Sequence, residues 1–232
     1  HIKLPSLKRA ISAGAPVPAR TLSRFSSMLG PDVRILTPYG ATEAMPVSIA
    51  NSQELLSREI QEKTANGAGI CLGKAVSGMQ IAIIRISDAE IPVWDDNLLQ
   101  VPQGVVGEIV VSGLNVTQSY FNRDSANRLS KIRDGHQMRH RMGDLGYVDA
   151  EGNLWFCGRK AHRVQAGGQE LYSVPCEQIF NQHPGVFRTA LVGVNGQAVL
   201  CVEREKDIPA IHPDRLRGEL LEIAAAHPRT RL

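Results

Sequence analysis

The chain has 232 residues, of which 43% are apolar and 21% charged, enough for one large or two small domains with a buried core. The formal net charge of +3 is too balanced to indicate nucleic-acid binding, and no apolar run approaches the roughly 20 residues that a membrane span needs. The four cysteines lack disulfide or zinc spacing and no signal-peptide pattern is visible, so a cytoplasmic location is expected.

The first forty residues predict an α/β layer. In chain order, the predicted elements are a strand at residues 7–13, a turn at 14–18, a helix at 19–29 and a strand at 33–36. The helix is predicted because Leu22, Phe25 and Leu29 share one face. The second strand is expected to break at residues 37–40, because Pro38 cannot donate a backbone hydrogen bond to a sheet.

From Gly67 onward the pattern favours strands. They are predicted at residues 81–86, 105–111, 147–148 and 154–157. The segment 81–86 reads IAIIRI, which is too apolar to alternate, so burial on both faces is expected. Residues 149–153 (DAEGN) are typical of a hairpin loop between the last two strands.

A polar, basic segment at residues 158–163 is interpreted as a hinge. Beyond it the pattern predicts a turn at 167–168, a helix at 175–180, strands at 189–194 and 198–203, and a helix after Pro213 that carries Leu216, Leu220 and Ile223. The expected fold is therefore mixed α/β and α+β, with a larger domain over residues 1–159 and a small α+β domain over residues 160–232.

Several common functional motifs are absent from the sequence. It contains no GxxxxGK[ST] phosphate loop, no HExxH and no GxSxG. The run from Gly67 to Gly73 misses GxGxxG by one place and is interpreted as an ordinary loop. His136, His140 and His162 lack a ligand at metal-binding spacing, so no histidine metal site is expected.

A first chemical cluster occupies residues 37–43 (TPYGATE). Tyr39, Thr42 and Glu43 supply an aromatic plane, a hydroxyl and a carboxylate, which together suit a base, a phosphate and a hard cation. The alternative is a polar loop that caps a helix, with Thr42 as the N-cap.

A second cluster occupies residues 140–147 (HRMGDLGY), where Asp144 lies between two glycines. Such an aspartate can accept two hydrogen bonds from a ribose diol, and a turn aspartate that bonds its own backbone is the alternative. The third cluster is the basic segment, where Arg159 follows Asp144 by 15 residues, one hairpin away. Both side chains could meet one ligand, or the segment is a solvated run of charge.

Taken together, residues 12–16 (SAGAP), 39–43 (YGATE), 143–145 (GDL) and 158–159 (GR) resemble, in order and spacing, the adenylate-forming superfamily. This superfamily includes acyl-CoA synthetases, peptide-synthetase adenylation domains and luciferases. The similarity covers nearly the whole chain. Among the members of the superfamily, the residues of these motifs look most like those of the bacterial β-lactone synthetases of long-chain olefin biosynthesis. The resemblance implies the later part of a large AMP-binding domain followed by the start of a small C-terminal domain.

The resemblance also implies residue roles. Gly14, Ala15 and Pro16 would line an adenine pocket, and Tyr39, followed by Gly40, would stack on the purine. Thr42 would contact the α-phosphate of ATP and Glu43 would ligate Mg²⁺. Asp144 would bind the ribose hydroxyls, and Arg159 would contact ribose or phosphate. Thr42, Glu43 and Arg159 are thus the expected catalytic residues.

The implied activity is ATP-dependent activation of a 2-alkyl-3-hydroxy fatty acid, followed by closure to a β-lactone. The reductase and decarboxylase of the olefin pathway would be partners. A long-chain acyl-CoA or acyl-AMP ligase is the first alternative, and a catalytically incomplete nucleotide-binding scaffold is the second. Nucleic-acid binding is the weakest interpretation, because the locally basic residues 123–141 have aromatic neighbours only in Tyr120 and Phe121.

The sequence departs from the family pattern in two places. Ala161 stands where most relatives carry Asp or Lys in the hinge motif, which questions the usual rotation of the small domain. The family's phosphate loop and adenylation lysine are expected upstream of His1 and beyond Leu232. The chain as written is therefore expected not to catalyse adenylation by itself.

Overall fold

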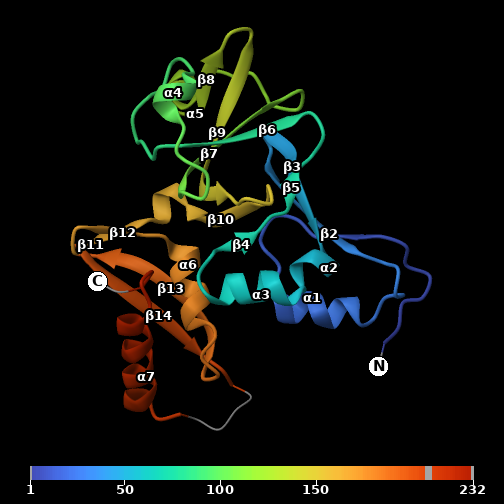
Figure 1. The fold of residues 1–232 in the computed structure, drawn as a ribbon, viewed down its shortest axis with the longest axis vertical. Coiled ribbons are helices and arrows are strands. Elements are labelled where there is room, and N and C mark those ends of the chain that lie inside the picture. Colours follow the sequence, from blue (N-terminus) through green and yellow to red (C-terminus); the bar gives the residue numbers. More distant parts are fainter. Residues whose placement is uncertain (1, 207–210, 231–232) are drawn as a thin grey trace. The chain divides into compact units, whose positions relative to one another are not determined.

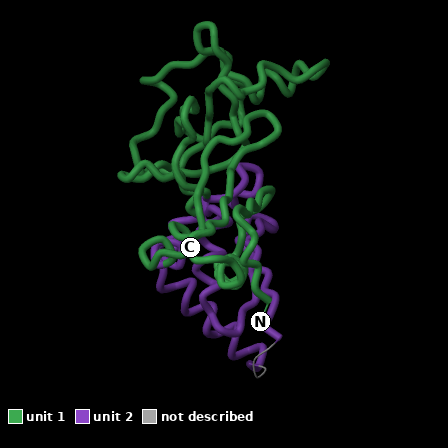
Figure 2. The backbone as a smooth tube through the Cα atoms, turned by 90° about the vertical axis from the view of Figure 1, so that its right-hand side faces the viewer, with its two compact units in different colours: residues 1–61, 71–156 green, residues 62–70, 157–232 purple. Residues whose placement is uncertain are grey.

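A computed structural model describes residues 2–206 and 211–230 of the chain (Figure 1). Its backbone divides into two compact units (Figure 2): residues 1–61 with 71–156, and residues 62–70 with 157–232. The division falls inside strand β10 (Leu154–Arg159). The expected boundary after residue 159 stays a prediction, and His1 and Leu232, the outer limits of the two expected domains, lie outside the described residues.

The first unit contains a four-stranded sheet built mainly from the first 75 residues. Its strands, in the order β1-β2-β3-β5, are β1 (Ala10–Ile11), β2 (Ile35–Ala41), β3 (Ala44–Asn51) and β5 (Lys74–Ala75). β1 pairs with β2 in parallel and the other pairs are antiparallel. Helix α1 (Ala19–Ser26) connects β1 to β2 and buries Leu22, as its apolar spacing predicts. Helices α2 (Ser52–Leu55) and α3 (Arg58–Ala65) follow β3.

Pro38 does not break the second strand, so that expectation is wrong. β2 continues through Pro38, which pairs with Ile49 of β3, and ends at Ala41. The physical reason lies in the neighbouring strand: β1 pairs with β2 only as far as Leu36. Beyond that point one side of β2 is a sheet edge within the described residues, and proline is tolerated at an edge. Conversely, the strand expected over residues 7–13 is limited to two residues.

A second sheet supplies most of the first unit's core. Its order is β4-β10-β9-β7-β6, with β8 paired to β9, and the strands are β4 (Ile70–Cys71), β6 (Met79–Ile84), β7 (Gly107–Gly113), β8 (Lys131–Asp134) and β9 (Gln137–Val148). The consecutive residues Ala82, Ile83 and Ile84 are all buried, which confirms that β6 is covered on both faces. Helices α4 (Asp96–Leu99) and α5 (Asp124–Ser130) lie in the connections.

The predicted hairpin around residues 149–153 is confirmed by its hydrogen bonds. The Asp149 carboxylate accepts the backbone N–H of Asn153 and the indole N–H of Trp155, both at 2.7 Å. Trp155 in turn stacks on Tyr147 with ring centroids 6.2 Å apart. These contacts fix the register of β9 against β10, and Asp144 lies in β9.

The second unit is a small α+β assembly, as expected. After the 3₁₀ turn η1 (Lys160–His162) its elements are β11 (Val164–Ala166), β12 (Gln169–Leu171), α6 (Ser173–Phe180), β13 (Val186–Val194), β14 (Gln197–Arg204) and α7 (Pro213–Ala226). Gly167 and Gly168 form the predicted turn, both at positive φ. Leu216 and Leu220 of α7 are buried in one cluster with Phe180, as their helical spacing predicts.

No helix in the described parts of the chain is long and apolar enough to cross a membrane.

Candidate functional site

The first predicted cluster lies on a β-hairpin. Ala41 pairs with Ala44, so Thr42 and Glu43 form the turn between β2 and β3. Because a strand and not a helix follows, the alternative of Thr42 as a helix N-cap is wrong. Thr42 is exposed at the turn and Glu43 is half-buried.

Gly40 has a steric role in this hairpin. The strand register shifts between the Tyr39–Ser48 and Ala41–Ala44 pairs, so Gly40 lies in an irregularity of the ladder. A Cβ atom at Gly40 would lie 2.5 Å from the carbonyl oxygen of Ala44. The absent side chain therefore lets the two strands approach each other beside the turn that carries Glu43.

Asp144 is joined to the same hairpin by Tyr39. The Tyr39 hydroxyl donates a hydrogen bond of 2.7 Å to Oδ2 of Asp144, which is only 3% exposed. Asp144 lies within β9 and not in a turn, so the turn-aspartate alternative is wrong. The register of β7 against β9 shifts here, and Gly143 takes a φ of 69°. Such a bulge redirects neighbouring side chains, which explains the glycine before the aspartate.

Glu43 has a second tyrosine as its partner. The Tyr120 hydroxyl donates to Oε1 of Glu43 at 2.6 Å, and the backbone N–H of Thr117 donates to the Glu43 carbonyl at 2.8 Å. The hydrogen bond from Tyr120 holds the pKa of Glu43 below its ordinary value. Burial raises the pKa of Tyr120 to about 12, so this hydroxyl keeps its proton at neutral pH.

Lys131 and His140 lie beside Tyr120, paired across β8 and β9. The Lys131 ammonium donates to the Thr117 hydroxyl at 3.0 Å and lies 5.6 Å from the centre of the Tyr120 ring. The His140 ring meets that ring edge-on at 6.4 Å. Burial lowers the pKa of Lys131 to about 8 and that of His140 to about 4. His140 is thus a neutral imidazole at pH 7, and its Nδ1 has no hydrogen-bond partner among the described residues.

The remaining predicted residues are more exposed. Gly14, Ala15 and Pro16 form an exposed loop between β1 and α1, in which Gly14 has a φ of 96°. Arg159 is exposed at the end of β10 and belongs to the second unit. A shared ligand between Arg159 and Asp144 stays a prediction.

Three arginines of the basic segment between residues 123 and 141 are paired with acidic side chains. Arg128 contacts Glu90, Arg139 contacts Asp134 and Arg141 contacts Glu108. Arg139 also lies over the ring of Trp94 at 4.0 Å. These arginines therefore have structural partners within the fold.

Sequence reasoning missed Tyr120, Lys131 and His140 as partners of Glu43. Tyr120 is 77 residues from Glu43 in the sequence, and no local pattern joins them. One signal was available: Lys131 is the lone lysine among arginines between residues 75 and 159. A lysine in a stretch whose other basic residues are arginines favours a site that needs a compact ammonium group, such as a buried one.

The residues of the hairpin suit Mg²⁺ bound together with a nucleotide. No group of three or more His, Cys, Asp or Glu side chains that could hold a metal occurs in the part of the chain that the structure describes. Mg²⁺ needs no such cage, because it is usually bound by one or two carboxylates together with phosphate oxygens and water. Glu43 offers one such carboxylate beside the exposed Thr42 hydroxyl.

The chain belongs to the AMP-binding enzyme family, whose model matches residues 1–121. This places it in the adenylate-forming superfamily, as the four motifs predict.

Two curated relatives extend the similarity over nearly the whole chain. The olefin β-lactone synthetase of Xanthomonas campestris is 44% identical over 98% of this chain, and that of Stenotrophomonas maltophilia is 45% identical over 90%. The chain spans 42% and 39% of the length of these relatives.

Solved structures confirm the fold. The o-succinylbenzoate CoA synthetase of Bacillus subtilis, in complex with its acyl-adenylate intermediate, superimposes with a TM-score of 0.69 over 100% of this chain and 42% of its own, at 23% identity. ATP-bound MatB of Rhodopseudomonas palustris gives 0.70 over 94% and 39%, at 24% identity. The mixed α/β architecture is thus that of the C-terminal portion of adenylate-forming enzymes.

Proposed function

We propose that the protein carrying this chain activates a 2-alkyl-3-hydroxy fatty acid with ATP and closes it to a β-lactone. The observation that carries this proposal is the 44–45% identity, over nine-tenths or more of the chain, to two olefin β-lactone synthetases. The geometry supports the nucleotide-binding part: one hairpin carries both the aromatic residue joined to Asp144 and the carboxylate of Glu43.

In the first step a carboxylate oxygen of the fatty acid attacks the α-phosphorus of ATP. A phosphorus–oxygen bond forms to the acid, and the bond to pyrophosphate breaks. Asp144 would accept the ribose hydroxyls and Tyr39 would stack on the adenine. Thr42 would donate to the α-phosphate, where its exposed position on the turn leaves the hydroxyl accessible. Arg159 would neutralise charge on ribose or phosphate.

Glu43 would hold Mg²⁺, which supplies charge neutralisation for the phosphate oxygens. The carboxylate is ionised at neutral pH, since the ordinary pKa of glutamate already lies well below 7 and the hydrogen bond from Tyr120 lowers it further. It is therefore ready to accept a cation without first losing a proton.

In the second step the 3-hydroxyl oxygen attacks the acyl carbon of the adenylate. The carbon–oxygen bond to AMP breaks, AMP leaves and the hydroxyl proton is released. Both reacting groups belong to one molecule, and the high effective concentration of the hydroxyl offsets part of the strain of a four-membered ring. No second substrate has to enter.

The test uses the full-length protein with ATP, Mg²⁺ and a 2-alkyl-3-hydroxy acid, with and without coenzyme A, and identifies products by mass spectrometry. We expect a product that has lost one water from the acid, with stoichiometric AMP, whether or not coenzyme A is present. A thioester that forms only with coenzyme A would instead identify an acyl-CoA ligase. Absence of AMP would favour a nucleotide-binding scaffold.

A further inference from the structure

Tyr120 supplies the one side-chain hydrogen bond to the Glu43 carboxylate among the described residues. Oε1 accepts the Tyr120 hydroxyl at 2.6 Å, and the backbone N–H of Glu43 itself also faces the carboxylate. A single carboxylate oxygen is a sufficient protein ligand for Mg²⁺ when phosphates and water complete the coordination shell. Oε2 is therefore the atom that this arrangement leaves for a cation.

Tyr120 is itself fixed at its backbone. Its N–H donates to Oδ1 of Asn127 at 2.7 Å, and its carbonyl accepts from Nδ2 of the same side chain at 3.0 Å. Asn127 belongs to α5, where its own N–H donates to the Arg123 carbonyl. One asparagine thus anchors both backbone groups of Tyr120 to helix α5. The position of the tyrosine is therefore fixed by this helix as well as by the loop that carries it.

The Tyr120 ring is fixed as well. The Lys131 ammonium and the His140 ring both contact it, and Lys131 is held by two hydrogen bonds to Thr117. Lys131 and His140 are 6% and 3% exposed, so neither side chain is free to move away. The hydroxyl is consequently presented to Glu43 by a ring with defined neighbours.

The loop that carries Tyr120 is also joined to the Glu43 turn through the backbone. Thr117 donates to the Glu43 carbonyl, and Val116 forms an isolated antiparallel bridge with Ala44. Glu43 and Tyr120 therefore belong to one hydrogen-bonded arrangement, in which a movement of the turn would carry the tyrosine with it.

We propose that Tyr120 is a positioning residue for the cation ligand: its hydroxyl fixes Oε1 of Glu43 so that Oε2 is presented to the Mg²⁺ of the bound nucleotide. This proposal rests on the proposed role of Glu43 in holding Mg²⁺. A glutamate side chain loses substantial rotamer freedom when it is ordered. Tyr120 supplies that order before the cation arrives, so removing its hydroxyl makes cation binding weaker. Groups that orient a metal ligand typically contribute tenfold or more to metal affinity, and we expect a loss of about tenfold.

The experiment measures Mn²⁺ binding to the full-length protein by electron paramagnetic resonance, in the presence of a non-hydrolysable ATP analogue. The variants are Tyr120→Phe, Glu43→Gln and the double variant. Tyr172→Phe is the matched control, because Tyr172 also donates to a glutamate, Glu170, but lies in the second unit. Binding of the analogue without metal and the melting temperature are measured for each variant to verify folding.

We expect Y120F to weaken Mn²⁺ binding about tenfold and Y172F to leave it unchanged. In the double variant, Y120F should add nothing to the loss caused by E43Q, because Tyr120 acts through Glu43. Asn127→Ala, which keeps the hydroxyl but removes the backbone anchor, should cause a smaller loss in the same direction and serves if Y120F unfolds.

Three results would overturn the proposal, and each has a different meaning. Unchanged Mn²⁺ affinity in Y120F and N127A, with a loss in E43Q, would reject positioning by Tyr120 while leaving the role of Glu43 intact. Unchanged affinity in E43Q would reject the role of Glu43 itself, and positioning by Tyr120 with it. Additive losses in the double variant would mean that Tyr120 acts on the fold and not through Glu43.

Discussion

At the residue scale, the carboxylates of this chain differ mainly in what surrounds them. Glu43 and Asp144 each accept a tyrosine hydroxyl on one oxygen. Glu177 of α6 is in a different position: burial raises its pKa, although Oε1 accepts the backbone N–H of Leu191 at 3.0 Å. The charges that face it include His162.

The raised pKa of Glu177 predicts a pH-dependent stability. A carboxyl whose folded pKa lies above its unfolded value binds its proton more tightly when folded, so stability falls as pH rises from the unfolded pKa of about 4.3 through the folded pKa. Glu177→Gln removes the charge, and its amide oxygen can still accept from Leu191. We expect E177Q to gain stability relative to the parent as pH rises from 4.5 to 7.5, measured as the urea midpoint.

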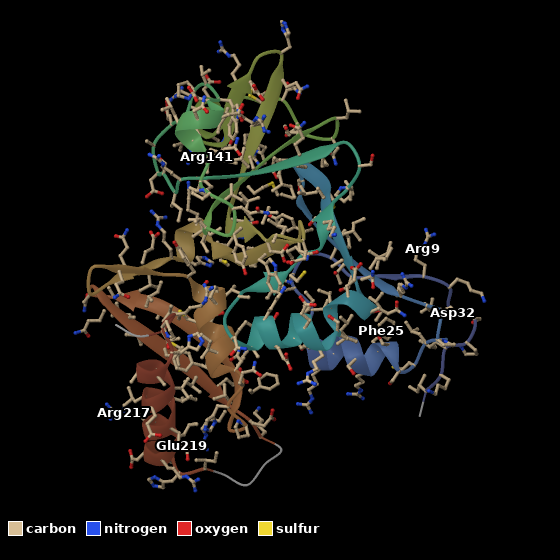
Figure 3. The ribbon with its side chains drawn as sticks, viewed as in Figure 1. Arg9, Phe25, Asp32, Arg141, Arg217 and Glu219 are labelled. Atoms are coloured by element: carbon tan, nitrogen blue, oxygen red, sulfur yellow. The ribbon has the colours of Figure 1, made fainter. Side chains whose placement is uncertain are left out.

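Glu219 is the control for this prediction and should behave in the opposite way. It lies on α7 (labelled in Figure 3), where hydrogen bonds from Arg215 and His183 lower its pKa. Its favourable contribution exists above the unfolded pKa and is lost on acidification. E219Q should therefore lose stability at pH 7.5 relative to the parent and approach it at low pH. Equal pH trends in both variants would contradict the assignment of Glu177.

Site residues could be predicted from the sequence where the chemical groups lie close together along the chain. They could not be predicted where a residue's role depends on partners that are distant in the sequence. Tyr39, Glu43 and Asp144 were identified because their types and glycine neighbours lie within two short segments. Tyr120 reaches Glu43, and Lys131 and His140 reach the Tyr120 ring, only through the tertiary fold, which pairs β8 with β9. The hydrogen bond between Tyr39 and Asp144 spans 105 residues and has no sequence signal of its own.

At the scale of elements, one buried arginine connects a loop and helix α5 to the second sheet. Arg141 of β9 (labelled in Figure 3) pairs with Glu108 of β7 through Nε and Nη2. Its guanidinium also donates to the carbonyls of Ser87, Ala89 and Leu129. Both side chains are 2% exposed or less. Five hydrogen bonds thus converge on one buried cation, and its loss would remove all of them together.

We therefore predict that Arg141→Met destabilises the fold by about 3–5 kcal/mol, the usual cost of breaking a buried ion pair by removing one partner. Urea unfolding measures this cost. Replacing Glu108 with Leu in the same protein should recover only part of it, because the hydrogen bonds from Arg141 to the three carbonyls stay lost.

The control for this prediction is Arg188→Met, which removes the exposed pair with Glu203, where the side chains are 71% and 41% exposed. Its effect should stay within about 1 kcal/mol. A cost for R141M as small as that of R188M would mean that water reaches the Arg141 site.

Helices and strands could be predicted where the spacing of apolar residues determines them. They could not be predicted where the extent of a neighbouring strand determines them. The helical spacing of Leu216 and Leu220 correctly predicted α7. The proline rule failed at Pro38, because whether proline disturbs a strand depends on how far the adjacent strand extends. The bulge at Asp144 was also missed, although the glycine that permits it was noted.

At the scale of the whole molecule, residues 158–163 are the predicted hinge, and Ala161, which departs from the usual residue of the hinge motif, is the position at which to test it. Ala161 lies in η1, an exposed 3₁₀ turn that begins at Lys160. Proline at position 161 disfavours a helical conformation at Lys160, whereas aspartate is compatible with the turn. We expect A161P to lower the turnover of the full-length protein strongly and A161D to leave it near the parent value.

Steady-state AMP release measures this effect, with the melting temperature as the check on folding. Normal turnover in A161P would show that the proposed reaction requires no motion at this turn. Equal losses in both variants would point to the alanine side chain itself and not to the backbone.

The close approach at Gly40 has an evolutionary consequence. Any mutation of its codon that adds a side chain forces that group against the Ala44 backbone, a contact that no rotamer can relieve. Lineages descended from this gene can therefore vary the hairpin at Met45, which is exposed and has no proposed chemical role, while position 40 is closed to them. Substitution patterns across such lineages should record this asymmetry: drift at position 45 and purifying selection at position 40.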